Sequence, residues 1–198
     1  MSVLLEDGKG RGNKAAVTRE NQLFVQSENH PHQHHESAVN GQVYQVNYFI
    51  TSGISASATT NVLFIKNLAA TRNLCVTYER MKAILAGTLP DAGCYFEIGF
   101  GQTYTSGGTE LSATQTNRSS ANQADILAYG NNPTLGGSFE RLDLELIKAS
   151  GDPIVFNKEG SVILSQNKTM TVRLVTATGH TGSAYARVTF MMIDKDET

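Results

Sequence analysis

The chain has 198 residues, of which 40% are hydrophobic, and a formal net charge of −2. That is enough for one domain with a core, or one domain plus an arm. The chain contains neither the concentrated basic block that nucleic acid requires nor an apolar run near the roughly 20 residues that span a bilayer, so we expect neither partner. Charged residues make up only 17% and there are 18 glycines, a composition that favours strands and turns over surface helices.

Residues 1–42 predict an extended N-terminal arm. Gly8, Gly10 and Gly12 alternate with polar residues, and this glycine density disfavours both helix and strand. The short apolar run Leu23, Phe24 and Val25 is long enough to pair as one strand. The arm holds too few apolar residues to bury a core by itself.

A histidine-rich stretch, NHPHQHHE (29–36), lies near the end of this arm. His30, His32, His34 and His35 are close enough to share a divalent ion, because neutral imidazole binds zinc, nickel and copper well. A flexible run fixes no geometry around an ion, however. Three interpretations stay open: a polar segment that extends along a partner, a metal site at a three-fold axis, and a pH-sensitive contact. We expect no other cofactor.

From residue 43 the sequence predicts strands. VYQVNYFI (43–50) and NVLFIKNL (61–68) have strand composition, and the small-residue stretch 52–60 connects them. NLCVTYERMKAILAG (73–87) fits a strand better than a helix, because Gly87 and Pro90 end it. CYFEIGFG (94–101) follows as its predicted partner strand. Cys75 and Cys94 lie in apolar surroundings and are expected to be buried free thiols, since the first residues lack a secretory signal.

Residues 102–138 contain few large apolar side chains and many Thr, Ser, Asn and Gly. We predict a long contact loop with one short element at ADILAY (124–129). Its candidate contact residues are Tyr104, Asn117, Arg118 and Tyr129. They suit sugar binding and subunit contact alike.

Strands resume at RLDLELIKA (141–149), PIVFN (153–157), SVILS (161–165), KTMTVRLVTAT (168–178) and SAYARVTFMMID (183–194). Apolar and polar residues alternate in the first and the last two, which predicts antiparallel sheets with one wet face. Eight or nine short strands with turns between them predict an all-β fold, an antiparallel β-sandwich over residues 43–198. A jelly roll is one arrangement that fits.

The sequence shows no convergent set of reactive groups. GFGQTYTSGG (99–108) lacks the Lys and Ser/Thr of a phosphate-binding loop. Cys75 or Cys94 would meet His180 only if the fold brought them together. Asp143 and Glu145 are interpreted as the polar face of an edge or outer strand. We therefore expect no enzymatic activity.

Two segments resemble a diffuse group of tailed-bacteriophage virion proteins. DGKGRGNKAAVTRENQLFVQS (7–27) is similar to their opening, of the form D-G-x-G-x-G-N-x-A-x-V-x-x-x-N-x-L. GGTELSATQTNRSSANQAD (107–125) and NNPTLGG (131–137) resemble a loop of the same group. Together they cover about a quarter of the chain. The matching residues are Asp7, Gly8, Gly10, Gly12, Asn13, Ala15, Val17, Asn21 and Leu23, and then Gly107, Gly108, Thr109, Asn117, Arg118 and Ser120.

The resemblance implies a structural role in a virion, made in the bacterial host cytoplasm. The interpretation that fits best is a homotrimeric capsid decoration protein whose arm binds the major capsid protein or neighbouring virion subunits. Lys9, Arg11, Lys14 and Arg19 would meet an acidic surface, and Leu23, Phe24 and Val25 would dock or add a strand. The alternative is a tail or baseplate component that binds a host surface, such as glycan, through residues 102–138.

Overall fold

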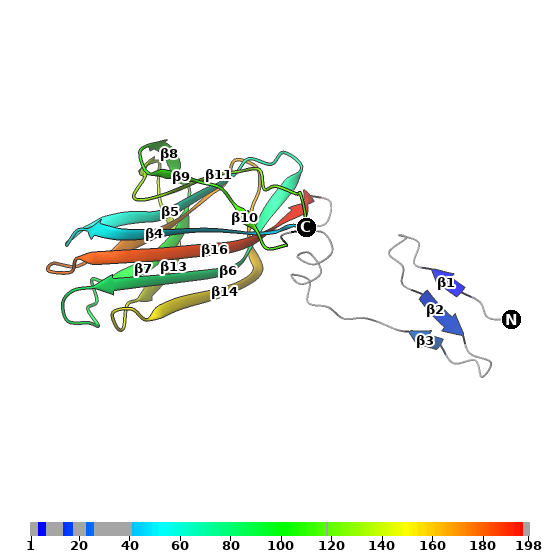
Figure 1. The fold of residues 1–198 in the computed structure, drawn as a ribbon, viewed down its shortest axis with the longest axis horizontal. Helices are drawn as coiled ribbons and strands as arrows, with labels where there is room; N and C mark the ends of the chain where they lie inside the picture. The colour runs from blue at the N-terminus through cyan, green and yellow to red at the C-terminus, as the bar shows by residue number, and fades with distance from the viewer. Residues whose placement is uncertain (1–3, 7–13, 18–22, 26–40, 118, 196–198) are drawn as a thin grey trace. The chain divides into compact units, whose positions relative to one another are not determined.

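A computed structural model describes residues 4–6, 14–17, 23–25, 41–117 and 119–195. The chain divides into two compact units, residues 1–35 and 36–198. In the first unit, β1 (Leu4–Glu6), β2 (Lys14–Val17) and β3 (Leu23–Val25) form a small antiparallel sheet in the order β1-β2-β3 (Figure 1). The predicted strand at residues 23–25 is therefore present, together with two strands that the glycine-rich sequence did not suggest.

Two antiparallel sheets build the second unit. The five-stranded sheet has the order β10-β4-β16-β6-β14, and the six-stranded sheet has the order β13-β7-β15-β5-β11-β9. The first contains β10 (Thr114–Gln115), β4 (Val43–Ile54), β16 (Gly182–Asp194), β6 (Arg72–Leu85) and β14 (Pro153–Leu164). The second contains β13 (Glu140–Leu146), β7 (Tyr95–Phe100), β15 (Thr169–Val175), β5 (Thr59–Asn67), β11 (Ile126–Gly130) and β9 (Thr109–Leu111).

Eight of these strands form a jelly roll. In chain order they alternate between the sheets except at β7 and β13, which follow each other in one sheet; β4, β6, β14 and β16 thus lie in one sheet and β5, β7, β13 and β15 in the other. The first strand of each sheet lies beside the last, giving β4-β16-β6-β14 and β5-β15-β7-β13. This is the double Greek key of a jelly roll, and it confirms the predicted all-β sandwich. The described part of the chain contains no helix with the length and apolar character needed to cross a membrane.

Alternating side chains from the two sheets fill the core. In β16, Ala184, Ala186 and Val188 are buried, whereas Tyr185 and Arg187 between them lie on the opposite face. Residues Met170, Val172 and Leu174 of β15 are buried in the same way, as the sequence predicted. Burial of each such large apolar side chain contributes about 1.5–3 kcal/mol.

The insertion between β7 and β13 supplies the remaining strands. β8 (Thr103–Ser106) and β12 (Thr134–Gly136) pair as a separate two-stranded sheet. β9 pairs with β11 at the edge of the six-stranded sheet, and β10 pairs with β4 at the edge of the five-stranded sheet. The segment 109–115 therefore crosses from one sheet to the other at this edge. The described part of residues 102–138 thus holds five short strands, β8 to β12, where the sequence predicted a long loop. The short element predicted at 124–129 is present as β11.

Three other predictions about strands are wrong. β7 does not pair with β6; it crosses to the other sheet and pairs with β13 and β15. Residues 153–164 form one strand, β14, which a register shift between Asn157 and Val162 interrupts. β4 continues to Ile54, through residues predicted to be a connection.

The leucines of β13 were expected to face the core, but Leu142 and Leu146 are exposed. A register shift between Arg141 and Asp143 pairs Asp143 with the buried Ile98, and Leu144 with Glu97 on the outer face. A single extra residue in one strand moves every later side chain to the other face. β13 is an edge strand, as predicted, but its acidic residues point inward at the rim of the sandwich.

Candidate interaction surface

Two of the predicted contact residues stack on each other. The ring of Tyr104 in β8 lies parallel to that of Tyr129 in β11, with 3.8 Å between the ring centroids and 2° between the planes. Tyr104 also lies 6.4 Å from Phe64 and donates its hydroxyl proton to the carbonyl oxygen of Gly107 at 3.1 Å. Phe64 belongs to β5, pairs with Tyr129 in register and is fully buried. The insertion thus covers the outer face of the six-stranded sheet, and we call residues 101–139 the flap.

An ion-pair network holds the other end of the flap. Glu97 of β7 points to the outer face but is only 4% exposed. Its carboxylate accepts hydrogen bonds from Nε of Arg173 at 2.9 Å and from Nη2 of the same residue, and Nη1 of Arg141 lies 3.7 Å away. The Arg173 guanidinium sits 3.3 Å from the ring centroid of Phe139 at the end of the flap. Charge and aromatic contact together anchor the flap to the sheet.

The remaining predicted contacts are placed less fully. Asn117 follows β10, and its Oδ1 accepts the backbone N–H of Ser119 at 3.0 Å, which closes a turn. Arg118 lies outside the described residues, as do Lys9, Arg11, Arg19 and the four histidines His30, His32, His34 and His35. Lys14 lies on β2 and Leu23, Phe24 and Val25 form β3, where only the backbone is described.

Within the described residues 41–117 and 119–195, no such flap covers the outer face of the five-stranded sheet. Register places Phe49, Tyr185, Lys82 and Pro153 in one row across β4, β16, β6 and β14. The next row is Asn47, Arg187, Arg80 and Val155, and the one after that is Gln45, Thr189, Tyr78 and Asn157. These rows define a surface that we call the open face.

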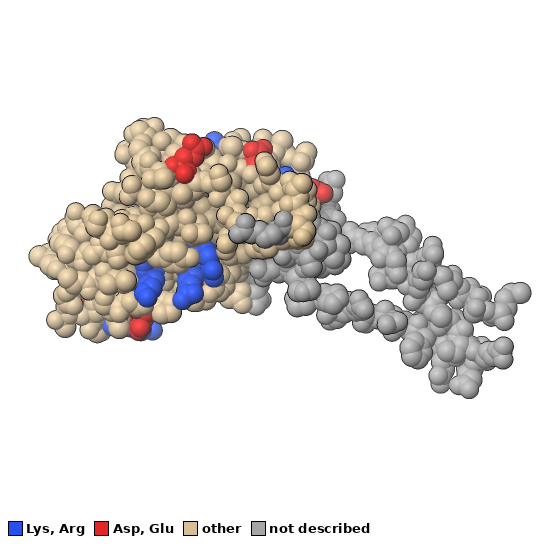
Figure 2. All heavy atoms as spheres, in the orientation of Figure 1, with Lys and Arg blue, Asp and Glu red and all other residues tan. Residues whose placement is uncertain are grey.

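The open face combines positive charge with apolar and aromatic groups. Its charged residues in these three rows are Arg80, Lys82 and Arg187, and all are basic. Figure 2 shows Lys and Arg atoms gathered over β6 and β16. The Arg187 guanidinium lies 5.4 Å from the Tyr78 ring centroid, while Phe49 and Val155 are 47% and 49% exposed. Arginine and aromatic residues are enriched in protein interfaces, and arginine and tyrosine in particular carry a large share of their binding energy.

Sequence reasoning missed a buried charge cluster at the rim between β13 and β14. Glu79 of β6 faces the core, is fully buried, and has no hydrogen-bond partner for either carboxylate oxygen. Burial raises the pKa of Glu79 to about 7; the Lys158 ammonium opposes this rise and the Asp143 carboxylate adds to it. Lys158 Nζ lies 2.7 Å from Asp143 Oδ2. An unpaired buried carboxyl of this kind is costly when ionised.

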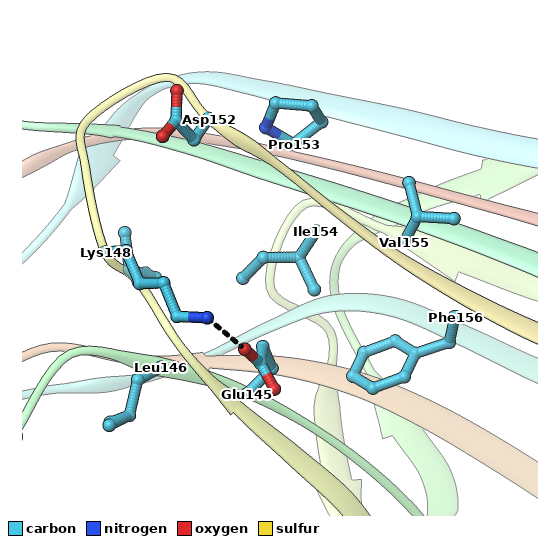
Figure 3. A pocket seen from close by; sticks show the side chains of 9 residues that line it. Glu145, Leu146, Lys148, Asp152, Pro153, Ile154, Val155 and Phe156 are labelled. Atoms are coloured by element: carbon cyan, nitrogen blue, oxygen red, sulfur yellow. Dashed lines mark ion pairs between the residues drawn. The ribbon is translucent and has the colours of Figure 1, made fainter.

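A pocket of about 340 Å³ opens along the same rim, where β13 ends and β14 begins (Figure 3). Pro153, Ile154 and Phe156 line one side, and the Glu145 carboxylate faces Lys148 Nζ at 3.4 Å on the other. This ion pair is largely exposed, so it contributes at most about 1 kcal/mol. The pocket lies on the two edge strands and borders the open face, since Pro153 and Val155 belong to both.

A second polar cluster lies between the β6–β7 and β15–β16 connections. His180 is 4% exposed, and its Nδ1 lies 2.9 Å from the Ala86 carbonyl oxygen while its Nε2 lies 3.0 Å from Asp91 Oδ2. Cys94 is fully buried and its Sγ accepts the backbone N–H of Ala177 at 3.4 Å. The fold therefore does bring Cys94 to His180, a meeting that the sequence gave no reason to expect, because the two residues lie on separate sheet crossings.

Comparisons with known proteins give no family assignment. No family model matches the chain and no curated protein matches it. Among solved structures, it is similar to the VP2 subviral particle of infectious bursal disease virus at 12% identity and a TM-score of 0.20, over 79% of this chain and 42% of that one. A structure of the Gx strain of the same virus matches at 13% identity and a TM-score of 0.17, over 98% and 51%. The chain thus spans about half or less of those chains. No functional conclusion rests on TM-scores this low.

Proposed function

We propose that this chain is a non-enzymatic structural protein of a bacteriophage virion, and specifically a capsid decoration protein. The observation that carries the proposal is the asymmetry of the jelly roll: the flap covers one sheet, while the other presents the open face. The likeness of residues 7–27 and 107–125 to phage virion proteins supports the virion. A fold alone does not define a function, so the test addresses the surface.

The partner that fits the open face is an acidic surface on the major capsid protein. Arg80, Lys82 and Arg187 supply charge without an acidic neighbour in their rows. Complementary charge of this kind steers association and fixes the docking register. The N-terminal unit would provide a second attachment, and self-association as a homotrimer would multiply both.

The geometry at Cys94 supports a non-enzymatic role. Both ring nitrogens of His180 are engaged, one by Ala86 and one by Asp91, and the Cys94 sulfur takes its hydrogen bond from the Ala177 backbone. A thiol nucleophile needs a base within hydrogen-bond reach of its own proton and access to substrate. Cys94 is fully buried, which suits a structural part.

The test is incorporation into particles. Copy number of the protein relative to the major capsid protein is measured by quantitative mass spectrometry on purified virions. A decoration protein gives about one copy per capsid subunit, which is also the ratio for a trimer on every three-fold position, or about one copy per three subunits if a single chain occupies each such position. A handful to a few dozen copies would instead place the protein in the tail or baseplate, and would overturn the proposal.

Charge reversal tests the open face itself. The double substitution Arg80→Glu and Lys82→Glu should lower incorporation by on the order of tenfold or more, because like charges then meet across the interface. The matched control is Lys148→Glu with Lys168→Glu, two exposed lysines outside the open face, which makes the same change in net charge. Equal incorporation of both double variants would show that the open face does not bind the capsid.

A further inference from the structure

We infer that Asp91, Cys94 and His180 form a zinc site that joins the two sheet crossings at one end of the jelly roll. One ligand atom from each residue lies within 4.8 Å of the other two. Thiolate, imidazole and carboxylate are the three donor types that zinc takes from proteins.

The tautomer of His180 is the first argument. The Ala86 carbonyl can only accept, so Nδ1 carries a proton and donates it at 2.9 Å. Nε2 then presents its lone pair to Asp91 Oδ2 at 3.0 Å. Two acceptors this close need a cation between them, either a second proton or a metal ion. A histidine whose other nitrogen donates to a backbone carbonyl is the usual arrangement for a zinc ligand.

The charges and distances suit a divalent ion. A Cys94 thiolate and an Asp91 carboxylate together neutralise Zn²⁺, so the filled site carries no net charge into the buried interior. Zinc bonds of about 2.0–2.3 Å place ligand atoms about 3–4 Å apart. The three atoms therefore need to move by only about 1 Å. Asp91 is partly exposed, which leaves room for water in the fourth position.

The backbone already holds the three ligands in place. The Asp91 carboxylate accepts the N–H of Gly93 at 2.8 Å, and the Cys94 N–H bonds to the Asp91 carbonyl at 2.9 Å. A Cβ at Gly87 would lie 2.8 Å from the His180 ring, so glycine there lets the imidazole sit against the chain. The hydrogen bond from Ala177 to Cys94 Sγ is the type that stabilises a metal-bound sulfur.

A zinc ion at this site would link the two connections that run between the sheets. The β6–β7 connection leaves the five-stranded sheet for the six-stranded sheet, and the β15–β16 connection returns from the six-stranded to the five-stranded sheet. An ion bound by both would resist their separation. It would make the stability of the protein depend on zinc concentration.

Cobalt substitution tests the site on the full chain, with His30, His32, His34 and His35 replaced by alanine so that they cannot bind. We expect one Co²⁺ per chain with a thiolate-to-cobalt charge-transfer absorption, displaced by Zn²⁺. Cys94→Ser should abolish the absorption, and Cys75→Ser, which alters the other buried thiol, should retain it. Zinc should raise the thermal midpoint of the Cys75→Ser protein but leave that of Cys94→Ser unchanged.

His180→Gln and Asp91→Asn separate ligand loss from unfolding, because both keep the size of the side chain. Each should weaken zinc binding by at least about tenfold, while the circular dichroism spectrum without zinc stays the same. Absence of the absorption in the protein with both cysteines would overturn the proposal, with a proton then filling the gap between Nε2 and Asp91. An absorption lost in Cys75→Ser and kept in Cys94→Ser would overturn it as well.

Discussion

The two buried glutamates, Glu97 and Glu79, have opposite effects on the stability of the folded protein. Glu97 is enclosed by Arg173 and Arg141, which satisfy its carboxylate. Glu79 is fully buried and neither oxygen has a hydrogen-bond partner. A buried charge stabilises only when partners replace the water that it loses. Glu97 therefore helps to hold the flap in place, whereas ionised Glu79 lowers the stability of the folded protein by an amount that depends on pH.

The buried Glu79 carboxyl makes the stability of the protein fall as pH rises. Its pKa is raised from 4.5 to about 7 by burial in the folded protein. Between these two values the folded state keeps a proton that the unfolded state has released, so stability falls as pH rises from about 4.5 to about 7, and is then constant with respect to this group. The full loss is about 3 kcal/mol. Glu79→Gln should remove it, raising the urea midpoint at pH 8 and changing it little at pH 4.5.

Glu97→Gln is the control for this prediction. The same substitution there leaves two arginines without their carboxylate, and should lower stability at pH 8 by about 2–4 kcal/mol. Urea unfolding followed by tyrosine fluorescence measures both variants against the unmodified chain. If Glu79→Gln lowers the midpoint at pH 8 as Glu97→Gln does, then the Glu79 carboxylate has a partner in solution and the account of its burial is wrong.

At the scale of elements, the flap is a structural cover held by aromatic stacking. The rings of Tyr104 and Tyr129 stack face to face, and Tyr104 shields Phe64 from solvent. Tyr104→Ala should therefore destabilise the sandwich by about 2 kcal/mol, through loss of the stack and exposure of the sheet beneath it. Urea denaturation at pH 5 and pH 8 measures this loss.

Tyr104→Phe is the matched variant, because it keeps the ring and removes only the hydroxyl that bonds to Gly107. It should cost less than about 1 kcal/mol. Binding of the particle to host cells shows whether the flap is a structural cover or a receptor-binding surface. If Tyr104→Ala kept full stability and lost adsorption of the particle, the tyrosine pair would be a receptor contact.

The strands that sequence predicted are those whose alternation is unbroken. β15 and β16 show apolar residues at every second position, and both are present where predicted, although β15 ends at Val175 and not at residue 178. Bulges defeated the pattern elsewhere. In β6, Val76 pairs with Phe190 and Tyr78 pairs with Thr189, so Thr77 is the extra residue that turns Glu79 inward. No residue in the sequence marks that change, because bulge positions are set by the partner strand.

Pairings across the sheets were equally hidden. Consecutive strands usually pair, which favours β6 with β7, yet a jelly roll moves the chain to the other sheet at nearly every connection. The cluster of Asp91, Cys94 and His180 and the rows of the open face both arise from these crossings. Composition could indicate a sandwich, but not which residues its topology would place together.

At the scale of the whole molecule, the N-terminal unit and the open face are two candidate attachments to one shell. If both bind the capsid, binding of one keeps the other close to its own site on the shell. Loss of either then weakens incorporation more than its own contacts would suggest. Deletion of residues 1–28 removes all three strands of the N-terminal unit and leaves the jelly roll intact. The truncated protein should fold with an unchanged thermal midpoint.

Incorporation of the truncated protein into particles should fall by on the order of tenfold or more relative to the full chain. Competition measures this directly: both forms are supplied together during assembly, and their ratio in purified virions is read by mass spectrometry. The jelly roll alone should still bind weakly, and should lose that binding on Arg80→Glu and Lys82→Glu. Equal incorporation of truncated and full chains would mean that the open face suffices and that the N-terminal unit serves another partner.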